Sequence, residues 1–244
     1  MEVNIKYRKD NGDKLPDPTL YRQLVESLLY LTMTRPDISH AVQVVSQFVA
    51  DPRRIHLSAV LRIMRYLWFT YYIGLLFSSN SSRQLRAYAD ADWARCPDTR
   101  RSTTGWCIFL GDSLISWKCK KQQTAFKSST ETKYRGISSA CSEITWLRGF
   151  LQDLNILHRT PTPLYVDNMS VIRIASNPVF HDHTKHIEVD CHFICDKFLA
   201  GEVTLPYVTS QQQLADIFTK AMTHARHDYL VDKLMMFTQP QFEG

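Results

Sequence analysis

Apolar residues return every three or four positions through the first third of the chain, which is the spacing of one face of an α-helix. The spacing predicts helices over about 19–33, 37–50 and 56–71. Pro36 and Pro52 separate these segments, because proline removes a helical hydrogen-bond donor. The first 75 residues are therefore predicted to form a small helical unit. Arginines in and just before its third helix suit either a solvated face or a nucleic-acid backbone: Arg53, Arg54, Arg62 and Arg65.

The pattern changes after residues 78–83, a Ser-Ser-Asn-Ser-Ser-Arg stretch typical of a linker. Strands are predicted over 85–88, 103–110, 114–118, 164–166 and 203–208, the last at a sheet edge because of Pro206. Helices are predicted over about 128–151, 168–175, 184–199, 211–222 and 224–237. This order is typical of the α/β class, with a mixed sheet and helices packed on it. We expect a helical unit at 1–80, an α/β domain at 81–222 and a helical extension at 223–244.

The charge and cysteine content narrow the class of protein only slightly. Among 244 residues, 29 Lys and Arg stand against 24 Asp and Glu, a formal net charge of +5. This excess permits a polyanion partner but does not require one. Six cysteines without a C-x-x-C pair indicate reduced thiols. Because no apolar segment resembles a signal peptide or a membrane span, we expect a cytoplasmic or nuclear protein that is not secreted and has no membrane partner.

Three acidic positions lie where the predicted elements can bring them together. Asp90 and Asp167 each follow a predicted strand, and Asp216 has apolar neighbours in the predicted 211–222 helix. Taken alone, an aspartate just past a strand is more often a turn former or a helix cap than part of a site. As a set they suggest a site, because ligands of such sheets gather at the carboxyl ends of strands. Converging carboxylates repel unless a cation such as magnesium neutralises them. Asp92 is a secondary candidate.

Several short segments stand in a specific order. They are AYADADWA (87–94), DTRRSTTGW (98–106), LISWKCKKQ (114–122), SSTETKY (128–134), WLRGFL (146–151), YVDN (165–168), NPVFHDHTKHIEVDCHF (177–193) and QLADIFTK (213–220). In this order they resemble the ribonuclease H domain of the Pol polyprotein of copia-type retrotransposons. YRQLVESLLYLTMTRPDISHAV (21–42) resembles the end of the reverse transcriptase region of the same polyprotein. The unit at 1–80 is therefore expected to be a remnant of the thumb or connection part of that region.

The resemblance implies a ribonuclease H-like fold, a five-stranded mixed sheet with flanking helices. It implies hydrolysis of the RNA strand of an RNA/DNA hybrid with two Mg²⁺ ions. The family's catalytic set is Asp, Glu, Asp, Asp. Carried over by motif, the aspartates and expected metal ligands are Asp90, Asp167 and Asp216. The family's glutamate is the last acid of Ser-Ser-Thr-Glu-Ala-Glu-Tyr, and at that position this chain has Lys133.

Lys133 changes the activity that we expect. Its ammonium group can pair with the aspartates and supply part of the charge of a metal ion, so we expect doubtful Mg²⁺ binding and weak or no hydrolysis. Glu131 lies two residues earlier, about 200° around the helix axis. Its position in a Ser-x-x-Glu capping box accounts for it without a catalytic role.

Substrate contacts are expected from a basic stretch and from the residue after Asp167. Lysine and arginine supply the salt-dependent part of phosphate binding. The candidates are Arg100, Arg101, Lys118, Lys120, Lys121 and Asn168. Two groups are expected to be structural, with Trp93, Trp106 and Trp117 in the core and His181, His183 and His186 as local hydrogen-bonding groups.

Two other functions stay open at this stage. A protein that keeps the fold without the glutamate can act as a non-enzymatic binder of nucleic acid or protein. The tetrapeptide Arg83–Arg86 resembles the R-x-L-R motif of secreted oomycete effectors, although it is short and lies far from the N-terminus. No stable protein partner is predicted.

Overall fold

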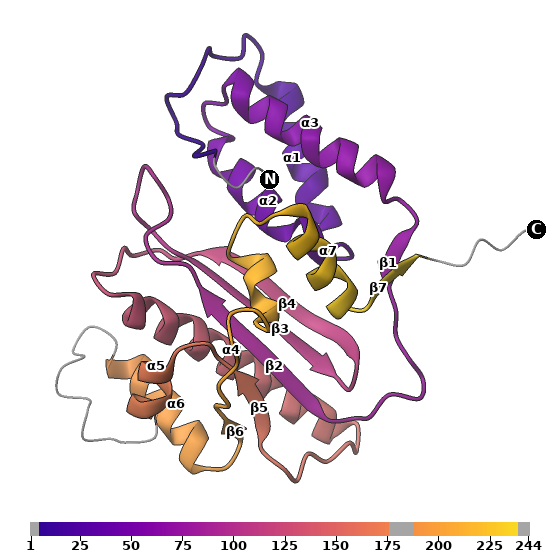
Figure 1. Ribbon diagram of the computed structural model, residues 1–244, viewed down its shortest axis with the longest axis vertical. Coiled ribbons are helices and arrows are strands. Elements are labelled where there is room, and N and C mark those ends of the chain that lie inside the picture. Colours follow the sequence, from indigo (N-terminus) through magenta and orange to yellow (C-terminus); the bar gives the residue numbers. More distant parts are fainter. Residues whose placement is uncertain (1–4, 176–187, 239–244) are drawn as a thin grey trace, which may run out of the picture.

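The computed structural model describes residues 5–175 and 188–238 (Figure 1). A helical unit comes first, and a five-stranded sheet with flanking helices follows. The elements of the helical unit, with η marking a 3₁₀ helix, are α1 (Thr19–Leu31), η1 (Pro36–Ile38), α2 (Ser39–Val45), η2 (Ser46–Phe48) and α3 (Arg54–Phe69). In these described ranges, no helix has the length and apolar character needed to cross a membrane.

The helical unit has a hydrophobic core of its own. Tyr21 and Leu28 of α1 pack with Val42 of α2 and Val60 of α3, and all four side chains are buried. The Tyr21 hydroxyl satisfies its hydrogen-bonding capacity in this core by donating to the carbonyl oxygen of Val45 at 2.6 Å. Three helices are therefore confirmed. The second is shorter than predicted, because 3₁₀ turns form both of its ends.

Five strands form the mixed sheet that the sequence predicts. They are β2 (Leu85–Ala91), β3 (Thr103–Leu110), β4 (Ser113–Lys121), β5 (Thr162–Tyr165) and β6 (Val203–Thr204). The strand order is β4-β3-β2-β5-β6. β2, β3 and β4 pair antiparallel, while β2, β5 and β6 pair parallel. The prediction of an α/β fold, with a five-stranded mixed sheet and flanking helices, is confirmed, including the edge position of β6.

Alternate residues of β3 pack into two separate hydrophobic cores, one on each face of the sheet. Trp106 and Ile108 face α4 (Ser129–Asp153), α5 (Met169–Ala175) and α6 (Glu188–Leu199). Cys107 and Phe109 face η4 (Leu214–Phe218) and α7 (His224–Lys233). The Ser128 cap of α4 and its partner Glu131 form the predicted capping box.

The segment predicted as a helix over 211–222 forms only the 3₁₀ turn η4. Gln213 is extended just before the turn, and its side-chain amide donates to the carbonyl oxygens of Ala89 (3.1 Å) and Tyr165 (3.4 Å). These hydrogen bonds anchor the start of η4 to two parallel strands. A helix that began at 211 would remove Gln213 from them, so the tertiary contact overrides the local helical pattern.

Close packing of η4 on the sheet depends on Gly105 in β3. A Cβ atom at this position would lie 2.6 Å from side-chain atoms of both Phe218 and Thr219. Because real Cβ atoms do not approach that closely, any larger residue at 105 would push η4 off the sheet. Gly105 also pairs with Asp90 in the ladder between β2 and β3.

Other predicted boundaries differ from the structure. β2 runs on to Ala91 instead of ending at 88, because it pairs with β3 up to Thr104. The predicted 224–237 helix ends at Lys233, and a left-handed residue, Met235 (φ 59°), leads into strand β7 (Met236–Thr238). β7 pairs antiparallel with β1 (Ile73–Leu75). The predicted 203–208 strand is regular only over β6, and beyond Pro206 a single bridge joins Tyr207 to Val166.

A buried ion pair holds the end of α3 to the start of α2. Arg35 donates to both carboxylate oxygens of Asp37 at 2.9 and 2.7 Å, and the Asp37 side chain has no exposed area. Arg35 also reaches the carbonyl oxygen of Thr70 (2.9 Å), and the Tyr66 hydroxyl donates to Asp37 (2.7 Å). The pair is therefore fully hydrogen-bonded, which is the condition under which a buried ion pair is tolerated.

We expect Arg35→Met to lower the free energy of unfolding by about 3–5 kcal/mol, because it leaves the Asp37 carboxylate buried without a cation. Lys14→Met is the matched control, since Lys14 lies 3.7 Å from Asp51 with both side chains mostly exposed. The control should change stability by less than about 1 kcal/mol. Urea unfolding followed by circular dichroism measures both, and equal effects of the two substitutions would contradict the structural role of the pair.

Candidate active site

Three carboxylates meet at one end of the sheet. Tyr88 of β2 pairs in parallel register with Tyr165 of β5, so Asp90 and Asp167, each two residues further on, emerge at the same edge. Asp216 enters from η4, which packs on β2 and β3. The side chains of all three aspartates are largely buried. Carboxylates buried this closely require positive charge nearby.

The Lys133 side chain supplies one of these positive charges. Lys133 lies in the first turns of α4, and its Nζ atom is 3.4 Å from Oδ1 of Asp90. The same ammonium group donates a short hydrogen bond to Oδ1 of Asp167. Only 18% of the Lys133 side chain is exposed. Lys133 therefore bridges two of the three aspartates.

Lys220 supplies a second positive charge, and this residue was not singled out from the sequence. Its Nζ atom lies 3.1 Å from Oδ2 of Asp90 and 2.6 Å from Oδ1 of Asp216. The neighbouring Thr219 hydroxyl donates to Oδ2 of Asp90 at 2.6 Å. Asp216 and Lys220 are four residues apart, a spacing that favours ion pairs and could have indicated the contact. Arg226 stands further out, 3.7 Å from Oδ2 of Asp216.

The side-chain charges of the site set its protonation. Burial alone would raise the pKa of Asp90, but the charges of Lys220 and Lys133 and the Thr219 hydroxyl outweigh burial and lower it. Burial would likewise lower the pKa of Lys220, yet Asp90 and Asp216 raise it. Asp216 differs, because burial and the negative charge of Asp90 raise its pKa despite the contact with Lys220. Asp90 and Lys220 are therefore an ionised pair at neutral pH.

Asp92 lies outside this ion-pair network although it is only two residues from Asp90. It is buried, and its Oδ1 atom accepts a short hydrogen bond from the backbone N–H of Thr103. Burial raises the pKa of Asp92 to about 7. Its observed contact is with the start of β3 and not with the lysines.

The arrangement of side chains does not fit a divalent metal ion. Among the described residues, no three His, Cys, Asp or Glu side chains are grouped so that they could hold one. Mg²⁺ requires oxygen ligands at about 2.0–2.1 Å, whereas the Asp90–Asp167 and Asp90–Asp216 pairs each share an ammonium group. Oδ1 of Asp90 is buried and accepts no hydrogen bond from a described residue, so the 3.4 Å ion pair with Lys133 is its polar contact. Glu131 is held in the cap of α4 by the Ser128 N–H (3.3 Å).

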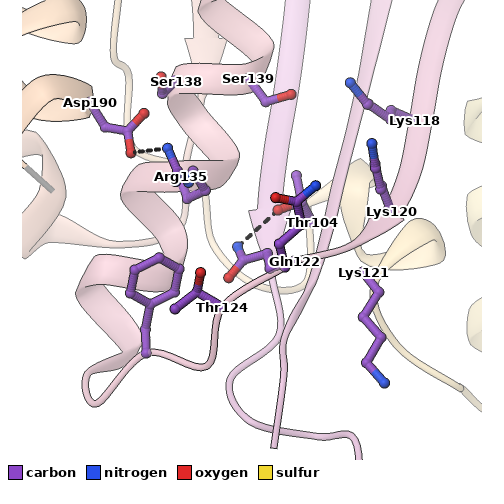
Figure 2. Close-up of a pocket in the computed structure, with 12 residues that line it drawn as sticks. Thr104, Lys118, Lys120, Lys121, Gln122, Thr124, Arg135, Ser138, Ser139 and Asp190 are labelled. Carbon is purple, nitrogen blue, oxygen red and sulfur yellow. Dashed lines mark hydrogen bonds and ion pairs between the residues drawn. The ribbon is translucent and has the colours of Figure 1, made fainter. Parts of the chain in front are cut away.

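The expected substrate residues are only partly brought together. Lys118 and Lys120 line one cavity on the α4 side of β4 (Figure 2). Lys121 lines the same cavity, but its ammonium group points away from it and donates to Gln47 (2.7 Å) and to the Cys96 thiol (2.8 Å). Asn168 caps α5 by accepting from the N–H groups of Ser170 and Val171. Arg100 and Arg101 lie in the loop before β3.

The two groups of residues expected to be structural differ in outcome. Trp106 is buried and Trp117 is partly buried, but Trp93 is 50% exposed, so its predicted core position is wrong. Trp93 follows the end of β2, where the sheet no longer covers it. His181, His183 and His186 lie outside the described residues.

Comparison with known proteins gives the family of the chain. No protein-family model matches it. The retrovirus-related Pol polyprotein of transposon RE1 from Arabidopsis thaliana is 41% identical over 92% of this chain and 15% of that protein. The corresponding polyprotein of transposon RE2 is 38% identical over 98% of this chain and 16% of that protein. The chain belongs to the copia-type retrovirus-related Pol polyproteins. It spans about one sixth of the length of these relatives.

Two other similarities are more limited. Secreted RxLR effector protein 161 of Plasmopara viticola is 43% identical over 52% of this chain and 90% of that protein. A crystal structure of ribonuclease H1 from Halobacterium salinarum has a TM-score of 0.42 and 13% sequence identity, over 56% of this chain and 94% of that one.

We expect Lys220→Met to destabilise the domain by about 3–5 kcal/mol at pH 7, because it leaves Asp90 and Asp216 with too little positive charge. The lowered pKa of Asp90 stabilises the fold above the ordinary aspartate pKa of about 3.9, and this contribution disappears as the pH falls through the folded value. The difference between wild type and Lys220→Met should therefore stay constant down to about pH 4 and shrink below it. Urea unfolding at several pH values measures it. Lys233→Met, at an exposed ion pair on α7, is the control. A destabilisation that is independent of pH would contradict the electrostatic origin.

Proposed function

We propose that this chain is the ribonuclease H-like domain of a copia-type Pol polyprotein, with a helical remnant of the reverse transcriptase region at 1–80 and a C-terminal extension after 222. Its substrate class is the RNA/DNA hybrid, and its hydrolysis of the RNA strand is impaired. The observation that carries this proposal is the bridge from Lys133 to Asp90 and Asp167, at the position where the family has its glutamate.

Family membership, strand order and the convergence of three aspartates support the hydrolase ancestry. In such enzymes the metal ions activate water and stabilise the leaving oxygen. In this chain, Asp90, Asp167 and Asp216 supply carboxylates in the expected places, but ammonium groups already neutralise them. Lys133 removes one carboxylate from the set and adds a competing cation, so both changes act against metal binding.

The same observation favours a second candidate, a nucleic-acid binder without turnover. Three carboxylates face two lysines at hydrogen-bonding or ion-pair distance, with the Arg226 guanidinium nearby. Such a set is close to electrically neutral without a metal ion and can persist as a structural network. A binder of this kind would retain salt-sensitive affinity for hybrids, because the lysines outside the carboxylate cluster are unaffected.

The effector-like tetrapeptide has weaker support. Leu85 and Arg86 of Arg83–Arg86 lie inside β2, where Leu85 is buried and Arg86 is 3.2 Å from Asp112. A recognition motif must be accessible, and half of this one is built into the sheet. The Pol relatives also match nearly the whole chain, whereas the effector matches about half of it.

Cleavage of a labelled RNA/DNA hybrid in Mg²⁺ tests the proposal. We expect wild-type protein to show little or no cleavage and Lys133→Glu to gain at least tenfold, because the substitution removes the competing cation and restores the fourth carboxylate. Lys133→Gln is the matched control, since it removes the charge without adding a carboxylate, and should gain less than Lys133→Glu. Robust and equal cleavage by wild type and Lys133→Glu would overturn the proposed impairment. If neither cleaves but wild type binds hybrid, the non-enzymatic candidate is favoured.

A further inference from the structure

A basic groove lies between the edge strand β4 and the first half of α4 (Figure 2). Its volume is about 300 Å³. Lys118 and Lys120 project from one side of β4, and Arg135, Ser138 and Ser139 of α4 lie opposite them. We call this surface the β4–α4 groove. It is separate from the cluster of aspartates, and Lys133 does not line it.

Neighbouring side chains hold two of the cations of the groove in place, but acidic side chains neutralise little of their positive charge. Arg135 is held by Asp190 at 2.8 Å, and 53% of the Arg135 side chain remains exposed. Lys118 lies over the Trp106 ring, 5.7 Å from its centroid. Lys120 is exposed. Asp190 is the single acid among the lining residues that the structure describes, so the groove carries a net positive charge.

Neutral polar groups complete the lining. Gln122 is buried, and its Nε2 atom donates to the Thr104 hydroxyl (2.9 Å) and to the carbonyl oxygen of Thr132 (3.0 Å), which fixes the floor of the groove. No described residue donates to Oε1 of Gln122. The cations and hydroxyl groups of the groove suit anionic oxygens of a ligand, and Oε1 of Gln122 suits a hydroxyl donor of the same ligand. A sugar–phosphate backbone has this chemistry, whereas an apolar ligand does not.

Strand register places the groove at the same end of the sheet as the aspartates. Ala91, next to Asp90, pairs with Thr104 of β3, and Thr104 pairs with Lys120 of β4. β2 and β4 run in the same direction, because each is antiparallel to β3. Two strand spacings amount to about 10 Å, so the groove and Asp90 lie close enough for a single duplex to reach both.

We propose that the β4–α4 groove binds the sugar–phosphate backbone of the nucleic acid whose other contacts lie at Asp90, with Lys118, Lys120 and Arg135 as the phosphate-contacting residues. The inference rests on the proposed nucleic-acid function and adds a binding surface that does not depend on hydrolysis. It assigns the phosphate contacts to Lys118 and Lys120, because the ammonium group of Lys121, which also lines the groove, is bonded to Gln47 and Cys96.

The test is equilibrium binding of a fluorescent RNA/DNA hybrid in EDTA, measured by anisotropy across a salt series. We expect Lys118→Glu with Lys120→Glu to weaken binding at least tenfold. The neutral pair Lys118→Gln with Lys120→Gln should weaken it less, and should lower the slope of log affinity against log salt by about 0.9 for each phosphate group that is no longer neutralised. The neutral pair also keeps the test valid if charge reversal disturbs folding, which circular dichroism monitors.

Lys9→Glu with Lys14→Glu is the matched control, because it changes the charge equally at two exposed lysines of the N-terminal segment. It should change affinity by less than threefold. The proposal is overturned if the groove variants bind as tightly as wild type, or if the control weakens binding as much as they do. Because no metal is present, this result is independent of the cleavage assay on Lys133→Glu. Weakened binding by the groove variants without cleavage by Lys133→Glu would support the groove and count against the ribonuclease function.

Discussion

Neutralisation of the buried Asp90 carboxylate is the constraint on which the site depends. This side chain has no exposed area, and it contacts Lys133 of α4, Lys220 beyond η4 and the Thr219 hydroxyl. An isolated carboxylate at such a depth would be protonated or would destabilise the fold. The ion pairs therefore also hold α4 and η4 against opposite sides of the end of β2.

Lys220 and Lys133 differ in the carboxylates that they connect. Lys220 lies four residues after Asp216 and forms with it a local pair in which Lys133 takes no part. Lys133 connects Asp90 to Asp167, which come from different strands, and in our proposal it occupies the position of the family's glutamate. A carboxylate there would add negative charge to the cluster and increase its demand for a metal ion. An ammonium group reverses that demand, so in our proposal the residue at position 133 sets the electrostatics of the whole site.

Much of the architecture could be predicted from local patterns, and the failures have identifiable physical causes. Strand runs and the Ser128–Glu131 capping box are local signals, so the order of elements and the mixed sheet followed from them. The edge where Asp90 and Asp167 emerge could be anticipated from parallel strands. The 3₁₀ turn η4 could not, because long-range hydrogen bonds from Gln213 decide it. Lys220 was missed because only the aspartate of its motif was considered. The groove was missed because tertiary packing decides which face of β4 lies beside α4, and Asp190, which holds Arg135, comes from the distant α6.

The pairing of β1 with β7 has a consequence for how the chain folds. Residues 76–235 lie between these two short strands, so the ribbon closes a loop that contains the whole sheet. Closing so long a loop in an unfolded chain has a large entropic cost for only a few backbone hydrogen bonds. Once the sheet and α7 are in place, most of that cost has already been met. The ribbon should therefore form late in folding and contribute more to the unfolding rate than to the folding rate.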